Sequence, residues 1–138
     1  TYKFEIGKGV QMADGKDVTI VANGLMVEQA LIAKDMLAEE GISARVINMA
    51  TIKPIDKDIL VKAAKETGAI VTAEEHSVIG GLGSAVCEVL AETCPVPVTK
   101  VGVKDAYGRS GKVPPLLEMY GLTAADIVAK AKEAIALK

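Results

Sequence analysis

Aromatic residues are scarce in this chain. Its 138 residues include no tryptophan, one phenylalanine and three tyrosines, although half of all residues are apolar. Alanine, valine, isoleucine and leucine must therefore form the core. The length is typical of one domain, and such a chain buries roughly 68% of the surface that it exposes when unfolded.

Features that accompany nucleic-acid or membrane binding are also missing. The 16 basic and 18 acidic residues are interspersed, the net charge is −2, and no basic patch alternates with aromatic residues. No apolar run has the length of a membrane span, and no stretch has the pattern of a signal peptide. We therefore expect neither nucleic acids nor membranes as partners.

Cysteine and histidine are too few for a disulfide framework or a zinc site. Cys87 and Cys94 are seven residues apart, so on one helix their Cα atoms would be roughly 10 Å apart, too far for a disulfide. With one histidine and no C-x-x-C pair, we expect no metal site. Two isolated thiols favour a reducing compartment, here taken as the cytoplasm. The five methionines are interpreted as core residues.

What the chain does contain is a regular alternation of strand-like and helix-like segments. The pattern predicts helices at 25–40, 56–67 and 81–93 and buried strands at 17–22, 44–49, 69–73 and 98–103. Alternation of this kind is typical of a parallel sheet with helices on both faces. We expect an α/β fold: a three-layer αβα arrangement with a mostly parallel five-stranded sheet and one antiparallel edge strand.

The edge strand is predicted from a turn. Residues 10–13 and 17–22 flank Asp14-Gly15, a pair that favours a β-hairpin. Residues 1–8 lack periodicity and are interpreted as a linker from an upstream module, which leaves 9–138 as the domain.

Helix ends are marked by capping residues. Asp56 is a good N-cap, and Gly41 and Gly68 are expected to end the helices before them. In the helix at 25–40, an apolar stripe lies opposite three acids that face water. The stripe comprises Met26, Ala30, Ala33 and Leu37, and the acids are Glu28, Asp35 and Glu39.

The C-terminal part is predicted to hold two helices. Pro114-Pro115 begins a short helix that ends at Tyr120. Residues 123–126 resemble a capping box that opens a second helix, with Ile127, Ala131 and Ile135 on one face.

Candidate chemistry gathers after the strand at 69–73. Glu74, Glu75 and His76 follow it, at the end of the sheet where open α/β folds bind ligands. On an extended segment Glu74 and His76 share a face, and a carboxylate beside an imidazole can act as an acid/base pair. No serine, cysteine or aspartate completes a triad. A structural or interface role is the alternative, and no residue is assigned as catalytic.

A glycine-rich turn opens the helix at 81–93. Its free amides and the helix dipole can hold a phosphate or carboxylate, although the spacing fits neither a Rossmann fingerprint nor a P-loop. The alternative is that the glycines let helix and sheet approach closely. A cation in the loop after the fourth buried strand would complete an anion site. The candidate effector-binding residues are Glu74, His76, Gly80, Gly81, Gly83, Ser84 and Arg109.

The chain as a whole resembles the C-terminal domain of transketolase and related thiamine-diphosphate enzymes, and its last part is most similar to split transketolases made as two polypeptides. Residues 74–76 and 80–85 also resemble deoxyxylulose-phosphate synthase and the beta subunits of 2-oxoacid dehydrogenases, so the exact enzyme stays open. The matching segments are 4–8, 17–24, 41–49, 52–56, 74–76, 80–85, 107–111 and 116–127.

The resemblance implies a parent enzyme that transfers a two-carbon ketol unit between sugar phosphates. Upstream domains, or a separate subunit, would bind thiamine diphosphate and Mg²⁺, because this chain has no Gly-Asp-Gly motif with its downstream asparagines. The domain itself would bind no cofactor, be inactive alone and serve assembly and effector binding within a homo-oligomeric parent. A stand-alone anion-binding module is the alternative.

Overall fold

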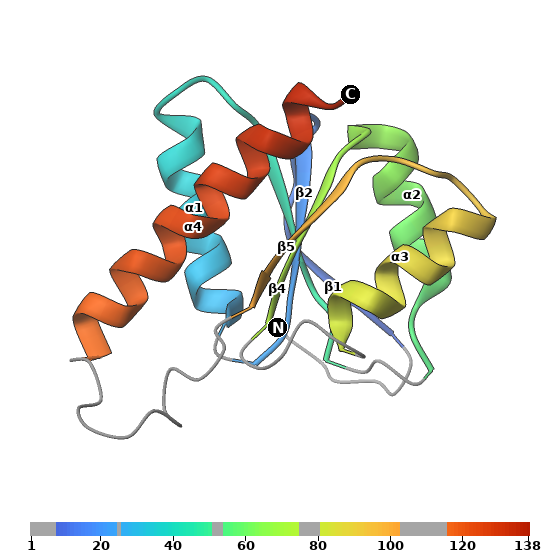
Figure 1. The fold of residues 1–138 in the computed structure, drawn as a ribbon, viewed down its shortest axis with the longest axis horizontal. Coiled ribbons are helices and arrows are strands. Elements are labelled where there is room, and N and C mark those ends of the chain that lie inside the picture. Colours follow the sequence, from blue (N-terminus) through green and yellow to red (C-terminus); the bar gives the residue numbers. More distant parts are fainter. Residues whose placement is uncertain (1–7, 25, 51–53, 75–80, 103–115) are drawn as a thin grey trace.

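The computed structural model describes residues 8–24, 26–50, 54–74, 81–102 and 116–138, with backbone alone for 116–123. This part of the chain contains five strands and four helices (Figure 1). In chain order they are β1 (Val10–Ala13), β2 (Val18–Ala22), α1 (Met26–Ala38), β3 (Ala44–Asn48), α2 (Lys57–Thr67), β4 (Ile70–Glu74), α3 (Leu82–Glu92), β5 (Val98–Gly102) and α4 (Leu116–Ala136).

The strands form one mixed sheet in the order β1-β3-β2-β4-β5. Strands β3, β2, β4 and β5 run parallel to one another, and β1 pairs antiparallel with β3 at the edge of the sheet. Every residue of β2 and β4 is buried, as expected for central strands covered on both faces. The predicted fold class is confirmed.

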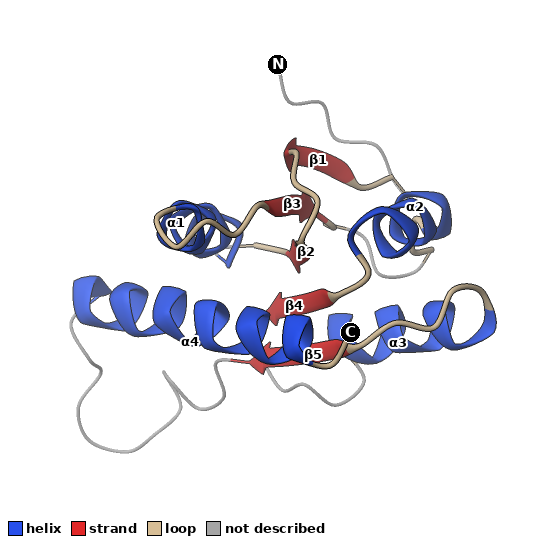
Figure 2. Cartoon of the chain, turned by 90° about the horizontal axis from the view of Figure 1, so that it is seen from above, coloured by secondary structure: helices blue, strands red, loops and turns tan. Residues whose placement is uncertain are grey.

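The helices cover the sheet in two layers. Helices α1 and α4 lie on one face, and α2 and α3 lie on the other (Figure 2). Ile20, Val46 and Val71 point toward α1 and α4, whereas their neighbours Val21 and Ile47 point toward α2 and α3. The two aliphatic cores follow from this alternation of side chains along each strand.

The predicted hairpin is wrong. Strand β1 pairs with β3, and β2 lies on the other side of β3. The connection from β1 to β2 therefore crosses the beginning of β3. Gly15 makes the crossing possible, because a Cβ there would overlap the backbone of Ala44 and Arg45. The sequence predicts a turn at Asp14-Gly15, whereas in the structure the glycine allows two backbone segments to approach closely.

Polar contacts fix this crossing. The backbone amide of Ser43 donates to a carboxylate oxygen of Asp17 at 2.7 Å, and the amide of Asp17 donates to the carbonyl of Ser43 at 2.8 Å. Nε of the buried Arg45 donates to the carbonyl of Gly15, and its Nη2 lies 2.7 Å from Glu66 in α2. Strand β3 thus holds the connection that passes over it.

The predicted helix caps are present. Asp56 accepts a hydrogen bond from the amide of Ile59 at 3.3 Å and also one from the amide of Gly9 at 2.9 Å. Gly68 ends α2 in the left-handed conformation at φ 76°, and Gly41 has φ 79° just after α1. Local sequence signals set these ends correctly.

The C-terminal prediction of two helices is wrong. Helix α4 runs without a break through Gly121 and Thr123, so residues 123–126 do not open a new helix. One glycine costs a helix only about 1 kcal/mol, and the later residues of α4 pack against α1 and the sheet. Ile127 and Ala131 are fully buried, as predicted, and Ile135 is half-buried.

The methionines divide between core and surface. Met26 and Met49 are buried, whereas Met12 and Met36 are exposed, which contradicts the interpretation of all five as core residues. The side chain of Met119 lies outside the described residues.

Candidate functional site

The candidate site is the junction between β4 and α3. Strand β4 ends at Glu74, and the structure next describes the chain at Gly81, just before α3 begins at Leu82. Residues of β4 alternate between the two faces, so Ile70 and Glu74 point to the face that α2 and α3 cover. The strand therefore delivers the Glu74 carboxylate to the amino end of α3.

The carboxylate of Glu74 caps α3. Its Oε1 accepts a hydrogen bond from the amide of Leu82, and its Oε2 accepts one from the amide of Gly83, each at 3.0 Å. The residue is only 5% exposed. A negative charge at a helix amino end is favoured by the helix dipole, and hydrogen bonds to a charged acceptor are among the stronger ones. The end of the strand and the start of the helix are thereby joined.

Two glycines make this contact possible. A Cβ at Gly81 would overlap Oε1 of Glu74. A Cβ at Gly83 would lie 3.0 Å from Oγ1 of Thr72 and 3.0 Å from Cδ of Lys100, so α3 packs closely on β4 and β5. This geometry agrees with the alternative interpretation of the glycine turn, as a device for close approach of helix and sheet.

The structure brings together only part of the predicted site. Glu74, Gly81 and Gly83 are in contact, and Ser84 lies half-buried in the first turn of α3. The candidates His76, Gly80 and Arg109 lie outside the described residues. Effector binding here stays a prediction, but the two amides that an incoming anion would need already bind Glu74.

Thr72 and Lys100 belong to the same junction and were not among the predicted residues. Oγ1 of Thr72 is fully buried and has no hydrogen-bond partner among the described residues. Lys100 of β5 lies opposite Thr72 of β4, and no ion pair joins it to any described residue. No sequence motif marks either residue, since their proximity follows from strand pairing.

The described residues do not fit a site for Mg²⁺, the metal that the resemblance implies for the parent enzyme. Nowhere among them do three or more histidine, cysteine, aspartate or glutamate side chains converge as a metal ion would require. The carboxylate of Glu74 is bound to backbone amides instead. We therefore derive no catalytic step through that metal on this chain. In the same part of the chain, no helix is long and apolar enough to span a membrane.

Two shallow hollows lie at the opposite end of the sheet. One, of about 380 Å³, has balanced charges, because Arg45 and Lys16 face Asp14 and Glu66. The other, of about 280 Å³, adjoins it and shares Asp14 and Ser43. Arg45 forms ion pairs with Glu66 at 2.7 Å and with Asp14 at 3.3 Å. The charges that line the larger hollow therefore offset one another and favour neither an anionic nor a cationic ligand.

The structure is thus an αβα domain in which Glu74, at the carboxyl end of β4, binds the free amides at the start of α3. The family model described as "Transketolase, C-terminal domain" matches residues 7–127. The chain therefore belongs to the family of transketolase C-terminal domains.

Individual relatives agree. The chain is 50% identical over 131 residues to a 6-deoxy-6-sulfo-D-fructose transketolase subunit of Clostridium sp. (strain MSTE9), covering 95% of the chain and 41% of that protein. A solved split-gene transketolase, an inactive beta4 tetramer, superposes with a TM-score of 0.88 at 58% identity, over 99% of the chain and 44% of its own. The 1-deoxy-D-xylulose-5-phosphate synthase of Heliobacterium modesticaldum (strain ATCC 51547 / Ice1) is 47% identical over 129 residues, covering 93% of the chain and 20% of that protein.

The chain spans about two fifths of the length of the transketolase relatives that it matches. These proteins therefore contain a large part that has no counterpart here.

Proposed function

We propose that the chain is the C-terminal assembly domain of a transketolase that transfers a two-carbon ketol unit between sugar phosphates. The observation that carries this proposal is the similarity to a split-gene transketolase, at 58% identity and a TM-score of 0.88. Catalysis would belong to the parent, in which upstream domains or a partner subunit bind thiamine diphosphate and Mg²⁺. The chain alone is inactive in this proposal, since its described residues offer no site for Mg²⁺.

We infer the assembly of the parent enzyme from the same relatives. One relative is a transketolase subunit and the solved split-gene transketolase is an inactive beta4 tetramer, which supports a homo-oligomeric parent with a partner subunit. Residues 1–8 would link this domain, 9–138, to the upstream module. Cys87 and Cys94 are both free thiols, which fits a reducing compartment such as the cytoplasm.

A second candidate is the C-terminal domain of a 1-deoxy-D-xylulose-5-phosphate synthase. The 47% identity to such an enzyme favours it, although this value is lower than the identity to either transketolase relative. Both candidates predict the same role in assembly for this domain and differ in the reaction of the parent.

The first experiment determines the intact mass and the N-terminal sequence of the natural gene product. We expect either a longer polypeptide or a chain that co-purifies with a thiamine-binding subunit. The purified parent is then assayed for ketol transfer between two sugar phosphates and for formation of 1-deoxy-D-xylulose 5-phosphate. Activity in the first assay alone supports the transketolase, and activity in the second alone contradicts it.

The same two assays are run on the isolated chain with added thiamine diphosphate and Mg²⁺, to test the proposal that the chain alone is inactive. We expect no turnover in either assay. Measurable ketol transfer by the chain alone would contradict that part and leave the family assignment unchanged.

A further inference from the structure

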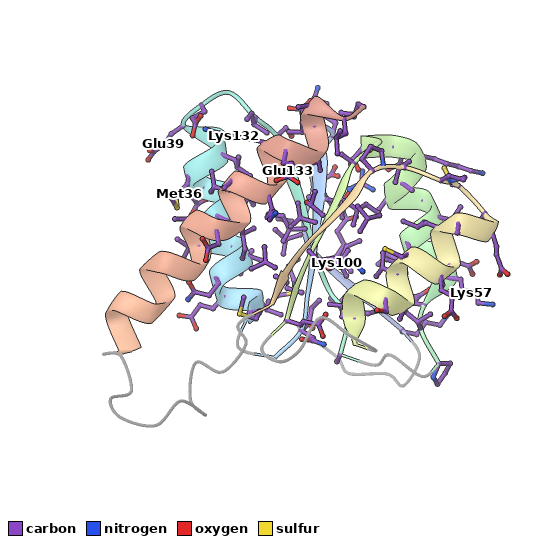
Figure 3. All side chains as sticks on the ribbon, viewed as in Figure 1. Met36, Glu39, Lys57, Lys100, Lys132 and Glu133 are labelled. Carbon is purple, nitrogen blue, oxygen red and sulfur yellow. The ribbon has the colours of Figure 1, made fainter. Side chains whose placement is uncertain are left out.

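Two large apolar side chains on the outer face of α1 are exposed to solvent. Ile32 and Met36 lie one helical turn apart and are 42% and 36% exposed. Figure 3 shows Met36 on the outer side of α1, and Glu39 in the turn just after the helix ends at Ala38, both away from the sheet. The three acids Glu28, Asp35 and Glu39 are exposed around the two apolar residues. We call these five residues the α1 face.

Helix α2 provides an internal comparison. Its exposed positions are Lys57, Asp58, Lys62, Lys65 and Glu66. All five are charged, as is typical of a helix whose outer side faces only water. Helix α1 also has a buried apolar stripe that faces the sheet, but two of its exposed residues, Ile32 and Met36, are apolar.

The charge around this apolar pair is negative. Glu28 and Glu39 have no ion pair with any described residue, and Asp35 has only Lys34 at 3.9 Å. The last turn of α1 contains no basic residue. The carbonyl end of the helix dipole therefore adds to the negative potential around Glu39.

We propose that the α1 face docks a basic amphipathic segment of another polypeptide. Apolar side chains of that segment would cover Ile32 and Met36, and its lysines or arginines would pair with Glu28, Asp35 and Glu39. A helix laid along an apolar strip with complementary flanking charges is a common mode of peptide recognition. Methionine suits such a surface because its flexible side chain adapts to the partner. The proposal is independent of the reaction of the parent, since it rests on the exposure and charge of α1.

A second copy of this chain is a poorer occupant. Two α1 helices packed antiparallel about the Ile32–Met36 pair would place Glu28 of each copy near Glu39 of the other. Like charges brought together in this way oppose association. In a symmetric interface the repulsion occurs twice. The charge pattern therefore favours a partner of opposite sign.

The test uses two synthetic helical peptides that share a strip of leucines. One carries lysines beside the strip, and the other carries glutamates at the same positions. Binding to the chain is followed by backbone amide shifts and by fluorescence anisotropy over a range of salt concentrations. We expect the lysine peptide to bind at α1 at least about tenfold more tightly than the glutamate peptide at low salt, and to weaken as salt is added.

Three variants assign the binding to the α1 face. The double variant Ile32→Ser/Met36→Ser should bind the lysine peptide at least about tenfold more weakly. Glu28→Gln/Glu39→Gln should also weaken binding and reduce its dependence on salt. Lys62→Ser on the outer side of α2 is the matched control and should leave binding unchanged. Circular dichroism checks that each variant is folded.

Several results would overturn the proposal. These are no shift of α1 amides with the lysine peptide, equal binding of both peptides, or unchanged binding by the Ile32→Ser/Met36→Ser variant. Sedimentation of the chain alone tests the other occupant. Self-association that disappears in the double variant would assign the α1 face to a second copy.

Discussion

Gly81 leaves the space that the carboxylate of Glu74 occupies. A Cβ at position 81 would overlap Oε1 of Glu74, the atom that accepts the hydrogen bond from the amide of Leu82. The two residues therefore act as one unit that ties the end of β4 to the start of α3. A mutational cycle can measure this coupling.

Gly81→Ala should lower the free energy of unfolding by roughly 2 kcal/mol, because it displaces a buried carboxylate from two backbone amides. Glu74→Ala should cost a similar amount for the same reason. In the double variant the added methyl group no longer meets the carboxylate, so the combined cost should be well below the sum. Urea unfolding of the four proteins gives the coupling, and simple additivity would contradict the proposed contact.

Inorganic phosphate should leave the amide resonances of Leu82 and Gly83 unchanged in the natural chain. Both amides already donate to Glu74, and its charge repels an incoming anion. In Glu74→Ala the amides are released at a helix amino end, and a saturable phosphate shift should appear there. A saturable shift in the natural chain would instead support the predicted effector site.

Gly15→Ala should be more destabilising than Ala substitution at the exposed neighbour Lys16, which is the control. The new Cβ would overlap backbone atoms of Ala44 and Arg45, and these cannot move without disturbing β3. We expect a loss of roughly 2 kcal/mol in thermal or urea unfolding, as for overpacking of a close-packed site. An effect as small as that of Lys16→Ala would show that the connection can pass over β3 at a greater distance.

Gln29→Met should stabilise the protein by about 1 kcal/mol, because it removes a buried amide that no described residue satisfies and keeps a side chain of similar length. Gln29 is 1% exposed, and neither its Nε2 nor its Oε1 has a hydrogen-bond partner in the described part of the chain. Gln11→Met, at an exposed position of β1, serves as the control and should change little. A lower melting temperature for Gln29→Met than for the natural chain would contradict this expectation.

The candidate site was predictable only in its location. The sequence places Glu74 after a buried strand and the glycines before a helix, so both are expected at one end of the sheet. In the structure, the anion at the amino end of α3 is the carboxylate of Glu74 itself. This arrangement depends on the face of the sheet to which Glu74 points and on the distance between α3 and β4, and neither can be read from the sequence. The glycine pattern is the same for an external anion and for an internal one.

The sequence by itself determined the alternation of strands and helices, the buried central strands, and the caps at Asp56 and Gly68, because these depend on near neighbours along the chain. The tertiary structure alone decided that β1 pairs with β3, that α4 is continuous, that Gln29 is buried, and that Met36 remains exposed. Each of these depends on contacts between segments far apart in the chain. Burial against a distant element outweighs local preferences of about 1 kcal/mol, so local signals do not fix such contacts.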